Sequence, residues 1–206
     1  MEKRIVFATG NEHKMEEIRK ILGDCGVKIV SMKEAGIEVE VVEDGDTFEA
    51  NALIKATEVG KLLPSDIVLA DDSGLEIDYL NKEPGIYSAR YAGVDTPYTV
   101  KNQMFLDKLA GVEDEKRSAR FVCAIAAHFP NGETQVVRGT IEGRIAHEIA
   151  GEHGFGYDPI FYLPEYACTT AELTPAKKNE LSHRGRALAK MRAILGKRKS
   201  DENISG

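Results

Sequence analysis

The segment Thr9–Lys14, with the sequence Thr-Gly-Asn-Glu-His-Lys, carries residue types that can hold a phosphate group. It follows the apolar run Ile5–Ala8, which predicts a buried strand. A strand that ends at Thr-Gly-Asn and continues as an amphipathic helix presents the N–H groups of a helix N-terminus, which attract anions. Lys14 adds a full positive charge one turn into that helix. The sequence therefore predicts a phosphate-binding segment directly after the first strand.

Lys55 interrupts the apolar side of a second predicted helix, residues 46–63. The apolar residues of this helix that share one face are Phe48, Ala52, Val59 and Leu62. With about 100° between successive helical residues, Lys55 falls in the middle of that stripe. Such a lysine either meets an anion or extends its ammonium group back to water. We favour phosphate contact, because the phosphate-binding segment and a group of carboxylates lie nearby in the sequence.

Two aspartates, Asp71 and Asp72, follow directly on the apolar stretch Ile67–Ala70, and the Ser-Gly pair after them predicts a turn. Adjacent carboxylates repel each other, so we expect only one to point into a cleft. With Glu43, this carboxylate offers the hard oxygen ligands that suit Mg²⁺. The alternative is an aspartate that caps a helix or forms an Asx turn at the strand end.

Ser182, His183 and Arg184 stand at the start of the last predicted helix. If Ser182 caps that helix, Arg184 lies in the first turn, where the helix dipole opposes a cation. A guanidinium in that position indicates recognition of an oxygen-rich ligand, and the alternative is an exposed arginine paired with a nearby glutamate.

The loop Gly154–Pro159 places two aromatic residues and an aspartate between glycines. Phe155 or Tyr157 could supply a stacking face for a purine ring, and Asp158 an acceptor for its ring N–H groups. The alternative is that these aromatic residues serve packing.

Composition narrows the possible partners. The 206 residues are 42% hydrophobic and 30% charged, with a net charge of −7, which disfavours nucleic acid as the main partner but not a phosphorylated small molecule. Cys25, Cys123 and Cys168 are widely spaced, as expected for reduced thiols, and no apolar stretch approaches 18 residues. We therefore expect a cytoplasmic protein without a membrane partner.

The P-loop, dinucleotide-binding, GxSxG and HExxH motifs are absent from the sequence, and the histidines lack zinc-ligand spacing.

The hydrophobic patterns predict a mixed α/β fold with parallel and antiparallel strand pairs. Helices are predicted over residues 12–22, 46–63 and 96–110, with a closing helix that carries Leu181, Leu188, Met191 and Leu195 on one stripe. Strands are predicted over residues 3–8, 27–31, 67–70, 75–79, 120–129 and 134–141, and Val39–Val42 is a further strand or an extended loop.

Six motifs occur in a fixed order: TGNxxK at 9–14, EDGxTFxxNAxxKA at 43–56, ADDSGL at 70–75, PGIYSARYAG at 84–93, GFGYDPIF at 154–161 and LSHRG at 181–185. Together, from residue 4 to about 196, they resemble the inosine/xanthosine triphosphate pyrophosphatase family. The resemblance implies an elongated, two-lobed α/β fold, a mixed sheet flanked by helices, in one domain (1–196) with a central cleft. It also implies a homodimer. The tail, residues 197–206, is polar and expected to fray.

The resemblance also implies an activity: Mg²⁺-dependent hydrolysis of ITP, dITP and XTP to the monophosphate and pyrophosphate, which cleanses the nucleotide pool. It implies that Glu43 and Asp72 bind the metal, that Asp72 is the base for the attacking water, and that Ser73 contacts substrate. The residues implied to hold the phosphates are Thr9, Gly10, Asn11, Glu12, His13, Lys14 and Lys55. Those implied to surround the base and the nearby phosphate are Phe155, Gly156, Tyr157, Asp158, Lys178, His183 and Arg184.

Two alternatives stay open. One is a Maf-type pyrophosphatase that acts on pyrimidine or modified nucleotides, which the SHR and GFGYD motifs disfavour. The other is a non-catalytic nucleotide-binding protein, which the pairing of Glu43 with Asp72 disfavours.

Overall fold

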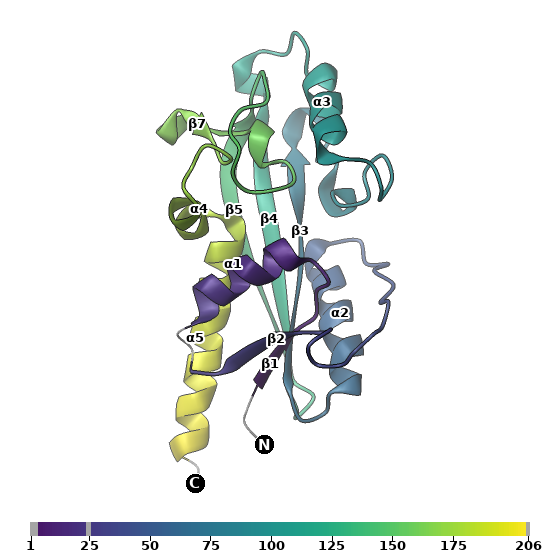
Figure 1. The fold of residues 1–206 in the computed structure, drawn as a ribbon, viewed down its shortest axis with the longest axis vertical. Coiled ribbons are helices and arrows are strands. Elements are labelled where there is room, and N and C mark those ends of the chain that lie inside the picture. The colour runs from purple at the N-terminus through teal and green to yellow at the C-terminus, as the bar shows by residue number, and fades with distance from the viewer. Residues whose placement is uncertain (1–3, 24–25, 205–206) are drawn as a thin grey trace. The chain divides into compact units, whose positions relative to one another are not determined.

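The computed structural model describes residues 4–23 and 26–204. Over these residues seven strands form one sheet in the order β2-β1-β3-β4-β5-β6-β7 (Figure 1). β1 is parallel to β2 and β3, whereas β6 is antiparallel to β5 and β7, so the predicted mixed α/β sheet is confirmed. The strands are β1 (Arg4–Phe7), β2 (Lys28–Ser31), β3 (Ile67–Ile77), β4 (Ser118–His128), β5 (Thr134–Ile145), β6 (Phe161–Leu163) and β7 (Cys168–Thr169).

The three earlier helices begin and end within two residues of their predicted bounds. The described α-helices are α1 (Glu12–Leu22), α2 (Phe48–Leu62), α3 (Tyr98–Lys108), α4 (Pro175–Leu181) and α5 (His183–Ile204). Val39–Val42 forms an extended loop and no strand, and Val42 is 75% exposed. Leu62 is also exposed, so it does not belong to the buried stripe of α2.

β3 differs most from expectation. The predicted turn at Ser73-Gly74 is wrong, because one strand runs from Ile67 to Ile77. Leu75 and Ile77 are fully buried, and their burial favours a continuous strand over the local turn preference of Ser-Gly. Successive side chains of a strand point to opposite faces, so Asp71 and Asp72 lie on opposite faces of β3.

The single closing helix is also corrected. The chain is extended at Ser182 (φ −65°, ψ 155°), which ends α4 and separates it from α5. Leu188, Met191 and Leu195 are buried on α5 as predicted, whereas Leu181 lies on α4. α5 continues to Ile204, so residues 197–204 are helical where the sequence suggests a frayed tail.

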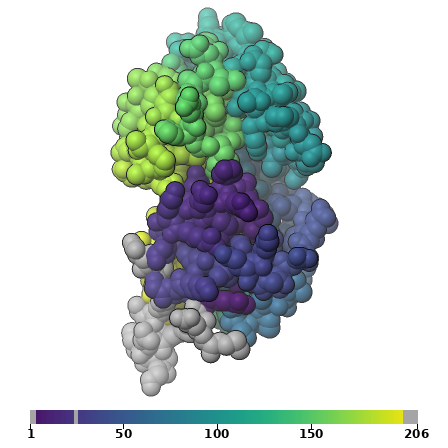
Figure 2. Space-filling view, viewed as in Figure 1, coloured from purple at the N-terminus to yellow at the C-terminus, as the bar shows by residue number. Residues whose placement is uncertain are grey.

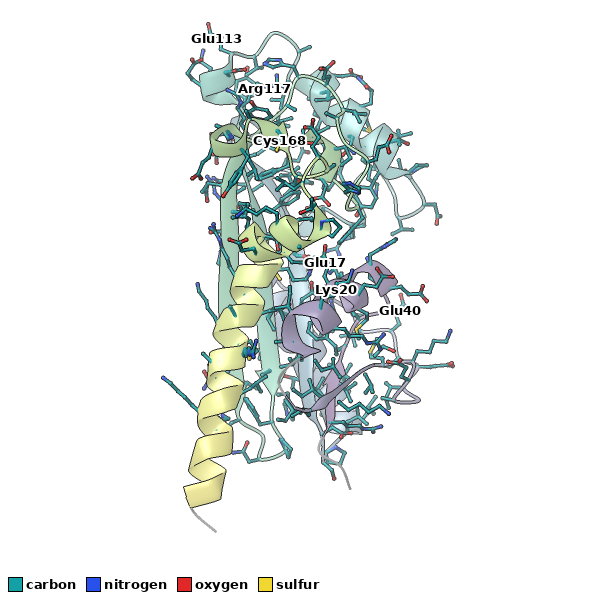
Figure 3. All side chains as sticks on the ribbon, turned by 60° about the vertical axis from the view of Figure 1, so that its left-hand side comes forward. Glu17, Lys20, Glu40, Glu113, Arg117 and Cys168 are labelled. Carbon is teal, nitrogen blue, oxygen red and sulfur yellow. The ribbon has the colours of Figure 1, made fainter. Side chains whose placement is uncertain are left out.

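The chain divides into two compact units. Unit 1 comprises residues 1–72, 123–139 and 184–206, and unit 2 comprises residues 73–122 and 140–183. Unit 1 has a core of apolar side chains from β1, α1, β4 and α5, and unit 2 has its own core, which includes Leu75, Phe105 and Phe161. Arg117 is buried in unit 2 and donates to four backbone carbonyls, of residues 109, 112, 145 and 146 (Figure 3). Cys123 and Cys168 are free thiols, and Cys25 lies outside the described residues.

Candidate active site

The start of α1 is shaped by two local hydrogen bonds from backbone N–H groups to side-chain oxygens. The side-chain Oδ1 of Asn11 accepts the Lys14 N–H at 3.1 Å and so caps the helix, and the Thr9 hydroxyl oxygen accepts the Asn11 N–H at 3.1 Å. Residues 10–13 are exposed, and the α1 segment lies at the molecular surface (Figure 2). The structure therefore presents the first turn of α1 to solvent, as a phosphate-binding segment requires.

Asp71 is the centre of a buried ionic network on one face of β3. Its Oδ2 lies 3.0 Å from Lys14 Nζ and 3.5 Å from an Arg184 guanidinium nitrogen, and Asp71 is only 1% exposed. Arg184 also pairs with Glu17, which extends from α1 (Figure 3). The resemblance implies that Arg184 lies near the base and the nearby phosphate, and the structure places it in unit 1 in contact with Asp71 and Glu17.

The charges around Asp71 decide its protonation. Burial acts to raise the pKa of Asp71, but the positive charges of Lys14, Arg184 and Lys55 outweigh it and hold that pKa well below its usual range. Asp71 is therefore ionised at neutral pH and serves as the counter-charge of two cationic side chains that the sequence assigns to substrate.

Lys55 and Glu43 lie on the α2 side of β3. The Thr47 hydroxyl oxygen caps α2 by accepting the Ala50 N–H at 3.1 Å. The Lys55 ammonium lies 2.9 Å from Glu43 Oε1 and donates to the Asp71 carbonyl oxygen at 3.1 Å. Its side chain is only 16% exposed, so Lys55 points inward to an anion, as its place on the helix predicts.

Asp72 occupies a different electrostatic environment from its neighbour. It is 9% exposed, and its Oδ2 accepts a hydrogen bond of 3.1 Å from the Asn51 amide. Burial raises the pKa of Asp72 to about 6, with the negative charge of Glu43 adding to the rise, while Asn51 and Lys55 act against it. A carboxyl group that titrates close to neutrality is well matched to accepting a proton from water.

Glu43 and Asp72 fit a magnesium ion better than a metal held by protein alone. Within residues 4–23 and 26–204, no three His, Cys, Asp or Glu side chains gather in a metal-binding group. Mg²⁺ commonly takes one or two carboxylates and completes its shell with water and substrate phosphates. The two carboxylates, with the Lys55 ammonium beside Glu43, form a donor set of that chemistry. Ser73 follows Asp72 on β3 and is partly buried.

The loop 154–158 of unit 2 is held together by Asp158. This buried carboxylate accepts the Phe155 N–H at 2.8 Å and the Thr170 hydroxyl at 2.8 Å, and it pairs with Lys178 Nζ at 2.8 Å. Gly154 has a φ of +79°, and a Cβ there would lie 2.3 Å from an Asp158 carboxylate oxygen. The loop conformation therefore requires glycine at 154, and most of the hydrogen-bonding capacity of Asp158 is used within the protein.

The two aromatic residues of this loop have different environments. Tyr157 is 3% exposed, its hydroxyl donates to the Ser88 carbonyl at 2.7 Å, and its ring packs edge-on against Phe105. The structure thus places Tyr157 in the core of unit 2, as the packing alternative expects. Phe155 is partly exposed, and the Lys178 ammonium lies 4.8 Å from its ring centroid. Phe155 is therefore the more exposed of the two aromatic residues of the loop.

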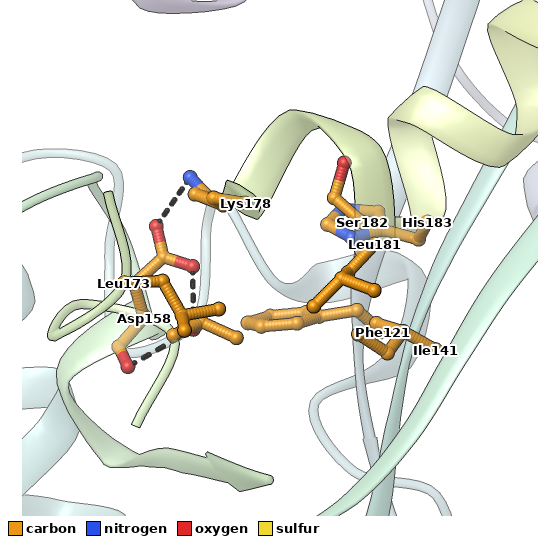
Figure 4. Close-up of a pocket in the computed structure, with 9 residues that line it drawn as sticks. Phe121, Ile141, Asp158, Leu173, Lys178, Leu181, Ser182 and His183 are labelled. Carbon is orange, nitrogen blue, oxygen red and sulfur yellow. Dashed lines mark hydrogen bonds and ion pairs between the residues drawn. The ribbon is translucent and has the colours of Figure 1, made fainter. Parts of the chain in front are cut away.

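A small pocket of unit 2 brings His183 and Lys178 to one place (Figure 4). The His183 ring stacks on Phe121, with 4.8 Å between the ring centroids. The pocket is lined by Phe121, Ile141, Asp158, Thr170, Leu173, Lys178, Leu181, Ser182 and His183. Apolar walls with a few placed polar groups are typical of small-molecule sites in general.

Two residues without a predicted role make direct contacts with predicted site residues. Asn51 donates to Asp72, and Glu17 pairs with Arg184. Their spacing offers a signal: Asn51 stands four residues before Lys55, and Glu17 three residues after Lys14, so each shares a helix face with a site lysine.

Comparison with known proteins decides the family. Residues 5–194 match the model of the Ham1 family. The chain belongs to this family. Among Ham1-related sequences, the dITP/XTP pyrophosphatase of Clostridium perfringens is 49% identical over 198 residues, which cover 94% of this chain and 97% of that protein.

Solved structures agree with this assignment. The Staphylococcus aureus Ham1 protein has a TM-score of 0.85 and 41% identity, and the match covers 95% of this chain and all of that one. A HAM1 protein from Coxiella burnetii has a TM-score of 0.86 and 41% identity, over 95% and 99% of the two chains. None of the helices in the described residues has the length and apolar character needed to cross a membrane.

Proposed function

We propose that this enzyme, a nucleoside triphosphate pyrophosphohydrolase of the Ham1 family, hydrolyses dITP, ITP and XTP to the monophosphate and pyrophosphate with Mg²⁺. The observation that carries the proposal is Asp72, a buried carboxyl group with a pKa near 6. The charges of Lys55 and Glu43 act on it, whereas the ammonium of Lys14 and the guanidinium of Arg184 contact Asp71. Relatives of almost equal length that are named dITP/XTP pyrophosphatases support the choice of substrates.

Hydrolysis of a phosphoanhydride requires charge neutralisation and a positioned water rather than a covalent intermediate. Asp72 accepts the proton of the attacking water, and Lys14, Lys55 and the first turn of α1 hold the phosphates. Glu43 and Asp72 would hold Mg²⁺, which would neutralise negative charge on the phosphates.

The pocket of unit 2 recognises the base. Phe155 stacks on the purine, and His183 donates to the 6-oxo group that hypoxanthine and xanthine share. Adenine carries a 6-amino donor there, so the pocket donor would face another donor. A buried site of this kind can reject the wrong partner by up to ~10⁴-fold.

The other expectations from the sequence remain part of the proposal. We propose a homodimer in the cytoplasm with a single catalytic domain, and we expect neither nucleic acid nor a membrane as a partner. The Maf-type alternative would show itself as a preference for pyrimidine or modified nucleotides.

The test is pyrophosphate release from dITP, ITP, XTP, GTP, ATP and dUTP, with Mg²⁺ and with EDTA. We expect turnover of dITP, ITP and XTP, no comparable turnover of ATP or dUTP, and none of any substrate in EDTA. GTP also carries the 6-oxo group, so its rate measures the selectivity at position 2 of the purine. Release of orthophosphate in place of pyrophosphate, or equal rates with ATP, would refute the proposal. The Asp72→Asn variant is the matched control for a contaminating phosphatase.

A further inference from the structure

Asn51 is a fully buried asparagine in the second turn of α2, with 0% of its surface exposed. Asparagine is a weak helix former, and burying an amide without partners costs free energy. A buried asparagine in a helix therefore calls for partners at both ends of its side chain.

Both ends of the Asn51 amide are used, and by different segments. Its Oδ1 accepts the Gly45 N–H at 2.8 Å, and its Nδ2 donates to Asp72 Oδ2 at 3.1 Å. A backbone N–H can only donate, so Gly45 fixes the oxygen end, and the nitrogen end must then face the Asp72 carboxylate. One side chain thus joins the loop that carries Glu43 to the strand that carries Asp72.

Lys55 repeats this pattern one turn later on the same face of α2. Its ammonium contacts the Glu43 carboxylate at 2.9 Å and the Asp71 carbonyl oxygen at 3.1 Å. The helix therefore contacts the same loop and the same strand twice, first through Asn51 and then through Lys55.

Gly45 shows how closely the loop approaches the helix. A Cβ at this position would lie 2.8 Å from Asn51 Oδ1 and 2.8 Å from Ala50 Cβ. Contacts this short would force the loop away from α2, so the hydrogen bond to Asn51 depends on glycine at 45.

We propose that Asn51 is a positioning residue that sets the distance and orientation between the carboxylates of Glu43 and Asp72. It contacts neither substrate nor metal and acts through these two side chains. The inference rests on the proposed function in one respect, that Glu43 and Asp72 are the metal ligands. Hydrogen-bonding partners of metal ligands typically contribute about 10–100-fold to metal affinity.

The test replaces Asn51 with leucine, which has a similar shape and makes neither hydrogen bond. Two readouts are compared with the wild type: Mn²⁺ binding, followed by electron paramagnetic resonance, and the Mg²⁺ concentration that gives half-maximal turnover of dITP. We expect Mn²⁺ binding about 10–100-fold weaker and a matching rise in the Mg²⁺ requirement. The affinity for dITP without metal should change little, because the lysines remain.

Gly45→Ala provides a second route to the same effect if Asn51→Leu does not fold. Asn102→Leu is the matched control, because Asn102 is likewise a buried asparagine within a helix. It lies on α3 in unit 2, and its amide donates to the Gly156 carbonyl rather than to a carboxylate. It should destabilise the protein without changing Mn²⁺ affinity. Wild-type metal dependence in both the Asn51 and Gly45 variants would overturn the positioning role alone. Equal Mn²⁺ binding by the wild type and Asp72→Asn would instead refute the metal assignment, and the positioning role with it.

Discussion

The two faces of β3 at residues 71 and 72 differ in chemistry although the residues are identical and adjacent. Asp71 faces α1 and α5 and meets Lys14 and Arg184, which keep it ionised. Asp72 faces α2, where burial and Glu43 raise its pKa to about 6. The strand thus separates a carboxylate that organises cations from one that can exchange a proton, and residue type alone does not reveal which is which.

The largest expected effect is on turnover in Asp72→Asn. This change keeps the shape of the side chain but removes its basicity, so we expect kcat for dITP to fall by about 10²–10⁴-fold. Binding of dITP should persist through Lys14 and Lys55. Near-normal turnover in this variant would show that Asp72 is not the catalytic base. Separate measurements of kcat and of the Kd for dITP distinguish a loss of catalysis from a loss of binding.

The same variant makes a prediction about stability and pH. The pKa of Asp72 is raised on folding, so the ionised carboxylate destabilises the wild type above pH 6, and this cost disappears as the pH falls below the unfolded value of about 4. The melting temperature of Asp72→Asn should therefore be higher than that of the wild type at pH 8. Near pH 3.5 the two melting temperatures should be equal. A gap that widens on acidification would contradict the raised pKa.

Lys55→Ala is expected to have the next largest effect on activity. Removing one preorganised cation from a phosphoryl site costs about 10²–10³-fold in rate. The melting temperature should change much less, because the lost contacts are one ion pair and one hydrogen bond. A large loss of stability with normal turnover would make Lys55 a structural residue.

Asp71→Asn should lower stability more than activity, the reverse of what we expect for Lys55→Ala. It leaves Lys14 and Arg184 without their shared buried charge, which we expect to cost about 3 kcal/mol, or roughly 6–12 °C in melting temperature. Turnover should fall less than in Asp72→Asn, because Asp71 acts through the two cations. Equal losses of kcat in the two variants would show that the carboxylates act as a unit.

Asp66→Asn is the matched control with the smallest expected effect. Asp66 also pairs with an arginine of unit 1, Arg4, but this pair is less buried than that of Asp71, with 36% of the Arg4 and 15% of the Asp66 side chain exposed. Ion pairs nearer the surface contribute less to stability than fully buried ones. We expect the melting temperature of this variant to stay close to that of the wild type and kcat to be unchanged. A fall in melting temperature as large as that of Asp71→Asn would show that burial of Asp71 does not explain its contribution to stability.

Local signals in the sequence predicted two structural features around the candidate site. The capped helix after β1 and the inward lysine on α2 follow from residue type and periodicity, and both are seen in the structure. The contacts of Arg184 with Asp71 join residues 113 positions apart, which local patterns do not encode. The burial of Tyr157 and the continuity of β3 through Ser73-Gly74 likewise depend on packing against distant segments, which overrode the local preferences.

Titration of the aspartate carboxyl carbons by nuclear magnetic resonance in the metal-free enzyme tests the difference between the two faces directly. Asp71→Asn and Asp72→Asn assign the two signals. We predict that the Asp72 signal titrates with a pKa near 6, while the Asp71 signal stays in its ionised form down to well below the usual pKa of about 4. Two signals that titrate together near pH 4, or an Asp71 signal that titrates above that of Asp72, would contradict the account.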